Sequence, residues 1–148
     1  MDRDAISVRE MCAGDLPAVC GLAEQLGYPV SLDVLLQRFG ALNKSTNHKL
    51  FVASSDTKVI GWVHVGREMS SLLSDMGADI GALVVDSEYR SAGVGGALMA
   101  AAEKWAWGQN IDVVRVRSNV KRSDAHRFYE RQGYLLVKSW HLFRKSSR

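Results

Sequence analysis

The chain has few of the features that assign a protein to a specialised class. It contains only two cysteines, Cys12 and Cys20, with no Cys-x-x-Cys pair and no histidine cluster at metal-ligand spacing. We therefore expect reduced thiols and no metal site. No apolar run approaches the ~20 residues of a membrane span, and the charged residues 1–4 lead into no apolar signal-peptide core. These absences predict a cytoplasmic protein without a membrane partner.

The composition that remains is that of an ordinary globular protein. The 148 residues are 47% hydrophobic and 24% charged, which is enough for one domain with a sizeable core. No internal repeat, low-complexity tract or Pro/Gly-rich linker divides the chain. We therefore predict a single domain over residues 1–148.

Charge is distributed unevenly along the chain. Residues 1–110 hold 9 Lys and Arg against 13 Asp and Glu, whereas residues 111–148 hold 10 against 3. The basic C-terminal part suits either nucleic acid or a ligand with several phosphates, and the acidic part suits a cationic acceptor. Aromatic residues are not interleaved with the basic ones, so nucleic acid is the least favoured of these partners.

Hydrophobic periodicity predicts a regular order of strands and helices. Ser31 is placed to cap a helix, and Gly27 and Gly133 are placed to end helices. The order predicts an α/β (α+β) fold, a mixed and mostly antiparallel sheet of six to seven strands flanked by about four helices. The predicted strands are 5–9, 50–53, 59–65, 80–85, 113–116, 134–137 and 140–143, and the predicted helices are 15–26, 31–39, 95–107 and 123–132.

The most informative segment is 83–99, where an apolar strand runs into a glycine-rich turn that opens an amphipathic helix. The first turn of a helix has N–H groups without partners, and the helix dipole makes that end partly positive. Gly93, Gly95 and Gly96 lack the Cβ atoms that would hold a ligand away from those groups. Arg90 adds a permanent positive charge nearby. The segment therefore predicts a site for a pyrophosphate.

Other phosphate motifs fit this segment poorly. A P-loop requires Gly-Lys-Ser/Thr, whereas the chain has Gly95-Gly96-Ala97. A dinucleotide-binding fingerprint requires a third glycine where Leu98 stands. The alternative without a ligand is that the glycines only let a helix pack closely on a strand.

Two motifs in order resemble those of the GNAT acetyltransferase superfamily. The family signature Arg/Gln-x-x-Gly-x-Gly/Ala at the start of a helix is matched in register by Arg90-Ser91-Ala92-Gly93-Val94-Gly95. The family pattern Tyr-x-x-x-Gly-Phe/Tyr is matched by Tyr129-Glu130-Arg131-Gln132-Gly133-Tyr134. The paired match covers about residues 79–134.

The resemblance implies the acyl-CoA N-acyltransferase (GNAT) fold, with a splayed sheet that takes acetyl-CoA as a cosubstrate between its fourth and fifth strands. The backbone of the fourth strand would pair with the pantetheine arm, and the turn with the pyrophosphate. Asn119, after the fifth strand, matches a position that contacts the arm in the family. The implied cofactor-binding residues are Leu83, Val84, Val85, Arg90, Ser91, Ala92, Gly93, Val94, Gly95, Gly96 and Asn119.

Acetyl transfer to an amine needs a proton acceptor for the amine and a proton for the departing thiolate. Tyr129 resembles the family tyrosine that acts as general acid, and a phenol with a pKa of about 10 keeps its proton at neutral pH. Simple aromatic packing is the alternative role for Tyr129. A backbone N–H of Val84 or Val85 is expected to polarise the thioester carbonyl. For the base, Asp79, His64 and Glu24 remain open.

The acceptor pocket is expected beside the first two helices and the third strand. Tyr28 and Trp62 are candidates to stack on a cationic or ring-bearing acceptor, with ordinary core packing as the alternative. We predict an N-acetyltransferase for a small amine, such as a polyamine, amino sugar or amino-acid derivative. A protein lysine or N-terminus as acceptor, or an acyl-CoA-binding sensor without turnover, are the alternatives. The resemblance leaves a homodimer open.

Overall fold

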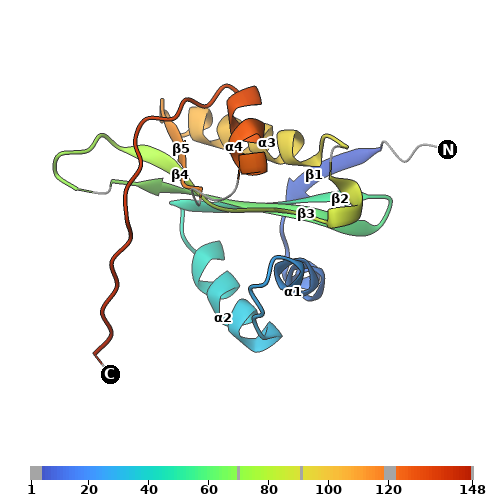
Figure 1. The fold of residues 1–148 in the computed structure, drawn as a ribbon. Helices are drawn as coiled ribbons and strands as arrows, with labels where there is room; N and C mark the ends of the chain where they lie inside the picture. Colours follow the sequence, from blue (N-terminus) through green and yellow to red (C-terminus); the bar gives the residue numbers. More distant parts are fainter. Residues whose placement is uncertain (1–4, 70, 91, 119–122, 148) are drawn as a thin grey trace. The chain divides into compact units, whose positions relative to one another are not determined.

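The computed structural model describes residues 5–69, 71–90, 92–118 and 123–147 (Figure 1). The chain divides into two compact units, Met1–Val116 and Arg117–Arg148. Among these described residues, the first unit holds a sheet and three α-helices, and the second holds one α-helix. The single domain over residues 1–148 stays a prediction.

The sheet of the first unit has five strands in the order β1-β2-β3-β4-β5. The first four strands pair antiparallel in chain order, and β5 pairs parallel to β4. Asp56 adopts a φ of 55° in the turn between β2 and β3, a conformation that Asp tolerates better than most residues. The strands are β1 (Ile6–Glu10), β2 (His48–Ser55), β3 (Lys58–Glu68), β4 (Gly77–Val85) and β5 (Val114–Val116).

Helices cover both faces of this sheet (Figure 1). The helices α1 (Leu16–Gln25) and α2 (Leu32–Asn43) lie on one side, here called the α1/α2 face, and α3 (Val94–Gly108) lies on the other, the α3 face. In α1 and α3 burial follows the helical period, which gives each of these two helices one apolar stripe toward the sheet. The fully buried residues of α3 are Val94, Leu98, Met99, Ala102 and Ala106. No helix among the described residues has the length and hydropathy to span a membrane.

The local start and stop signals in the sequence are confirmed. The Ser31 hydroxyl accepts a hydrogen bond of 3.2 Å from the Val34 N–H at the start of α2. Gly27 follows α1 with a φ of +82°, and Gly133 follows α4 (Ser123–Arg131) with a φ of +91°. Only glycine adopts such angles without strain, so these two positions fix where the helices end.

The last two predicted strands, 134–137 and 140–143, are wrong, because these residues form no strand in the described part of the chain. The described sheet therefore has five strands instead of six or seven. The apolar residues Leu135, Leu136 and Val137 are consecutive and do not alternate, so they define no single sheet face. A strand also needs a partner for its backbone groups, and the second unit contains no other strand among its described residues.

Asp15 ties the end of β1 to the start of α1. Its two carboxylate oxygens each accept a 2.8 Å hydrogen bond from the Arg9 guanidinium, and one also accepts the Cys12 N–H at 2.8 Å. Only 6% of Asp15 is exposed. The Arg9 hydrogen bonds are the main reason why the pKa of Asp15 is lowered to about 2 from an ordinary 3.8.

We expect Asp15→Asn to lower the free energy of unfolding at pH 7 by about 1–2 kcal/mol, discounted because Arg9 is half-exposed. A lowered native pKa stabilises the fold above the unfolded-state value and ceases to do so as pH falls through the native value. The difference between the two proteins should therefore shrink between pH 4 and pH 2, as measured by urea unfolding across pH. The exposed Asp75→Asn is the matched control. A deficit that stays constant with pH contradicts this account.

Candidate active site

The turn that follows β4 is anchored from two other elements. The Asp86 N–H donates to the Ile60 carbonyl of β3 at 2.8 Å, and the buried Asp86 carboxylate accepts the Glu88 N–H at 3.0 Å. These bonds shape the short 3₁₀ helix η2 (Ser87–Tyr89). The Gln25 side-chain oxygen, at the end of α1, accepts the Ser87 N–H at 3.0 Å. The entry to the glycine turn is therefore held by both β3 and α1.

The glycine turn opens α3 in the way the sequence predicted. Gly93 has a φ of +85°, and no heavy atom lies within 4 Å of where a Cβ would stand. The helix makes its first bond from the Ala97 N–H to the Gly93 carbonyl. Val94, Gly95 and Gly96 therefore have N–H groups without an acceptor inside the helix. Arg90 precedes them with an exposed side chain on extended backbone, and Ser91 lies outside the described residues.

The strands β4 and β5 pair over only part of their length. Their register runs from Ala78 opposite Val114 to Ile80 opposite Val116. Beyond this point, residues 81–85 of β4 have no strand on that side among the described residues. This is the splayed edge that the resemblance implied.

The direction of the backbone groups along this open edge follows from the β3–β4 register. Backbone N–H and C=O groups of successive residues in a strand point to opposite sides. The Asp86 N–H points to β3, and the Val84 carbonyl lies 2.9 Å from where a Cβ of Gly61 in β3 would stand. Val84 thus faces β3, and Leu83 and Val85 face the open edge. This geometry removes Val84 from the candidate backbone donors and adds Leu83.

His64 lies on the α1/α2 face with its ring half-buried. Its Nε2 is 3.0 Å from Nδ1 of His48 in β2, and the two ring centroids are 5.1 Å apart. Burial lowers the pKa of His64, and the neighbouring His48 lowers it further. His64 is therefore neutral at pH 7 and able to accept a proton.

The other candidate bases are placed differently. Asp79 accepts a 3.1 Å hydrogen bond from Nε of Arg115, with which it forms an ion pair across β4 and β5. The Asp79 carboxylate is therefore already engaged by Arg115. Glu24 is exposed on α1. Of the three candidates, His64 has the environment best suited to a base.

The two candidate acceptor aromatics also differ. Trp62 packs against the core cluster of Met11, Leu16, Val19 and Val52, which supports a packing role, although its buried Nε1 has no hydrogen-bond partner among the described residues. Tyr28 is 73% exposed after α1 and is open to a ligand.

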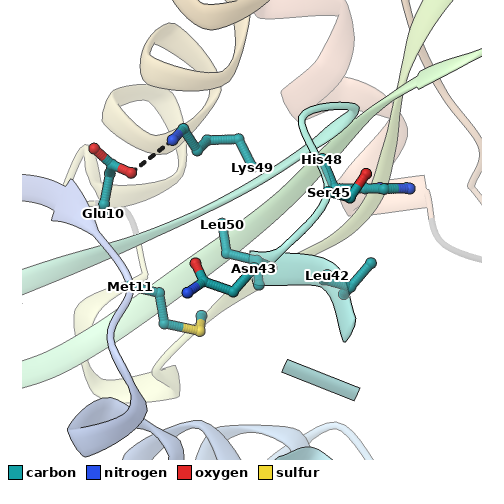
Figure 2. Close-up of a pocket in the computed structure, with 8 residues that line it drawn as sticks. All are labelled: Glu10, Met11, Leu42, Asn43, Ser45, His48, Lys49 and Leu50. Carbon is teal, nitrogen blue, oxygen red and sulfur yellow. Dashed lines mark hydrogen bonds and ion pairs between the residues drawn. The ribbon is translucent and has the colours of Figure 1, made fainter. Parts of the chain in front are cut away.

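His48 also lines a small pocket at the end of the sheet, which Figure 2 shows with the ion pair between Glu10 and Lys49 at 2.6 Å. Its volume of about 40 Å³ suits water and not an acceptor molecule. The lining residues are Glu10, Met11, Leu42, Asn43, Ser45, His48, Lys49 and Leu50.

His48 was not among the site residues predicted from the sequence. The β2–β3 hairpin could have indicated it, because the hairpin register places Leu50 opposite His64 and therefore His48 on the same face of the sheet as His64.

In the second unit, Tyr129 lies on α4. Its ring contacts those of Phe128 and Tyr134 edge to face, with centroids 5.2 Å and 6.1 Å away. These contacts fix the ring within the unit, which agrees with the aromatic packing considered above. Asn119 lies outside the described residues.

Comparison with known proteins identifies the family. Residues 18–134 match the model of the acetyltransferase (GNAT) family, and the chain belongs to that family. It is 29% identical over 93 residues to the aminoalkylphosphonate N-acetyltransferase of Salmonella typhimurium, covering 63% of this chain and 59% of that protein. It is 26% identical over 132 residues to the uncharacterized N-acetyltransferase YhdJ of Bacillus subtilis, covering 84% and 86%.

A solved structure shares the fold. The aminoglycoside N-acetyltransferase AAC(6')-Iy in complex with CoA superposes with a TM-score of 0.84 at 18% identity, covering 95% of this chain and 94% of that one. The family, the fold class and the enzyme class predicted from the sequence are thereby confirmed. The individual site residues stay predictions.

Gly61 brings α3 against the sheet at the candidate site. A Cβ there would lie 2.9 Å from the Val84 carbonyl oxygen and 3.1 Å from side-chain atoms of both Val94 and Leu98. We expect Gly61→Ala to lower the free energy of unfolding by about 1–3 kcal/mol, seen as a Tm lower by roughly 3–10 °C. The control is Gly40→Ala on α2, where no heavy atom lies within 4 Å, and this change should not destabilise the fold. Equal Tm values for the wild type and Gly61→Ala would contradict the close packing inferred at Gly61.

Proposed function

We propose that this protein transfers the acetyl group of acetyl-CoA to the amine of a small molecule. The observation that carries the proposal is the continuity of two features in residues 81–96. The open edge of β4 leads through an anchored turn into the unpartnered N–H groups of α3. An extended arm ending in a pyrophosphate matches both features at once.

The residues present fit this ligand. Gly93, with open space where a Cβ would stand, supports the assignment of the α3 N-terminus to the pyrophosphate. Val85 and Leu83 offer backbone groups along the open edge to the pantetheine arm. Since the arm starts at the turn, its far end reaches Leu83, whose N–H is the proposed donor to the carbonyl oxygen. Acetyl-CoA supplies an acetyl group activated as a thioester.

His64 is the proposed base for the amine. A primary amine is mostly protonated at pH 7, so its proton must be removed before the nitrogen can attack the carbonyl carbon. His64 lies opposite Ala82, one residue from Leu83 along β4. As the C–N bond forms and the C–S bond breaks, the thiolate takes a proton, and Tyr129 is the proposed donor. This last role rests on the place of Tyr129 in the sequence motif.

The proposed acceptor is a small molecule, which the relatives support by what they act on. One relative acts on an aminoalkylphosphonate, and the structural relative acts on an aminoglycoside. The cytoplasmic location and a homodimer remain predictions. A protein acceptor and a sensor without turnover are the remaining alternatives, and an acceptor screen separates all three.

The test is a panel of amines incubated with acetyl-CoA while the release of free thiol is followed. We expect turnover with at least one small amine and no release above background with lysine-containing peptides. Gly95→Glu places an anion among the N–H groups of the α3 N-terminus and should abolish acetyl-CoA binding in calorimetry without unfolding the protein.

Gly21→Glu adds the same charge on an exposed position of α1, where no heavy atom lies within 4 Å, and should leave acetyl-CoA affinity unchanged. Wild-type affinity in Gly95→Glu contradicts the phosphate site. Acetyl-CoA binding without thiol release on any amine or peptide favours the sensor, whereas release on peptides alone favours a protein acceptor.

Tyr129→Phe should reduce kcat by about 10²-fold or more while the Kd for acetyl-CoA stays within threefold of the wild type. The phenylalanine ring keeps the aromatic contacts within the unit and removes only the hydroxyl. Rapid-quench kinetics and calorimetry measure the two quantities. Tyr134→Phe is the matched control, because the family motif accepts either residue there. A wild-type kcat in Tyr129→Phe would contradict the assignment of Tyr129 as the general acid.

A further inference from the structure

Two glycines make room for the rings of His48 and His64, here called the histidine pair. A Cβ on Gly66 would lie 2.5 Å from Nδ1 of His48, so the His48 ring occupies the space of the missing side chain. A Cβ on Gly81 would lie 3.1 Å from Nδ1 of His64. Each ring therefore lies close to glycine backbone, His48 against β3 and His64 against β4, where an added Cβ would crowd the ring.

The two nitrogens of His64 face different surroundings. Nε2 is directed at Nδ1 of His48, at 3.0 Å. Nδ1 is beside Gly81, which is exposed and belongs to the open part of β4. The nitrogen that can meet an incoming amine is thus Nδ1, and Nε2 is the nitrogen that the partner histidine controls.

A neutral imidazole carries one N–H, so the contact between the rings decides which nitrogen of His64 is basic. If Nε2–H of His64 donates to Nδ1 of His48, then Nδ1 of His64 holds a lone pair toward Gly81. If His48 donates instead, Nδ1 of His64 carries the hydrogen and cannot accept a proton.

We propose that His48 is a positioning residue, whose Nδ1 accepts the Nε2–H of His64 and so keeps the basic Nδ1 of His64 facing the acceptor amine. This proposal rests on the proposed function. During the reaction the ammonium proton passes to Nδ1 of His64 and the freed amine keeps the lone pair. The imidazolium formed still donates Nε2–H to His48, and it returns the proton from Nδ1 to water after the product leaves.

The charged groups around the pair do not replace this role. Lys49 on β2 pairs with Glu10, and Asp79 on β4 pairs with Arg115 on β5. The pocket residues that α2 contributes near His48 are Leu42 and Asn43, which carry no charge. Burial is the main reason why the pKa of His64 is lowered, and the neighbouring His48 is the second.

The first experiment is nitrogen NMR of ¹⁵N-histidine-labelled protein without any ligand. At pH 7.5 we expect His64 to show a protonated Nε2 and a bare Nδ1 in the wild type. In His48→Phe, which keeps a ring over Gly66 and removes the acceptor, this single tautomer should be lost. A wild-type His64 with its hydrogen on Nδ1 overturns the proposal.

The second experiment is the pH profile of kcat/KM on the best amine of the screen. We expect His48→Phe to lower the plateau at least about 10-fold with an unchanged Kd for acetyl-CoA. His48→Gln retains an acceptor oxygen and should restore most of the plateau. It also removes the electrostatic effect by which His48 lowers the pKa of His64, so the acidic limb should move to higher pH.

The matched control is His141→Gln in the second unit, which should leave the plateau, the limb and the His64 tautomer unchanged. Circular dichroism establishes that each variant is folded, and His48→Gln keeps the test decisive if His48→Phe fails to fold. If both His48 variants keep the wild-type plateau of kcat/KM and the wild-type position of the acidic limb, the role of His48 is overturned. This outcome leaves the proposed function standing. A wild type that binds no acetyl-CoA in calorimetry overturns the proposed function, and the role of His48 falls with it.

Discussion

The point at which β4 and β5 stop pairing governs the rest of the site. The two strands share a short parallel ladder, and the part of β4 beyond Ile80 leaves its outward N–H and C=O groups without a strand among the described residues. Such groups are costly to leave unpaired and readily bond an extended ligand. Because α3 begins a few residues later, one stretch of chain offers an edge for an arm and an N-terminus for phosphates.

Glycines have different structural consequences on the two faces of the sheet. On the α3 face, Gly61 lets the helix start rest directly on β3, which fixes the phosphate turn relative to the strands. On the α1/α2 face, Gly66 and Gly81 make room for two imidazole rings instead of a helix. The absence of a side chain thus allows close packing of a helix on one face and makes room for the proposed base on the other.

Features with a local cause could be predicted from the sequence. Ser31 caps α2, Gly27 and Gly133 end helices, and Gly93 opens α3, because each depends on backbone angles or on a side chain within a few residues. The family motif extended this to the fold class. The prediction of strands at 134–137 and 140–143 was wrong, because a strand exists only where a distant segment pairs with it.

The same limit explains the residues that sequence reasoning placed incompletely. The outward direction of Leu83, in place of Val84, depends on the β3–β4 register. His48 meets His64 only because the β2–β3 hairpin keeps its register beyond a bulge at Ala53 and Ser54. Neither a register nor a bulge has a reliable signature in one sequence, since each is set by pairing across the sheet.

The donors assigned to Leu83 and Val85 belong to the main chain, which has a consequence for how this protein can diverge. Any amino acid except proline supplies the same N–H, so the proposed hydrogen bonds themselves place no demand on the side chains at these two positions. Under the proposed function, a protein that differs at these two positions would still present the same backbone donors to the thioester.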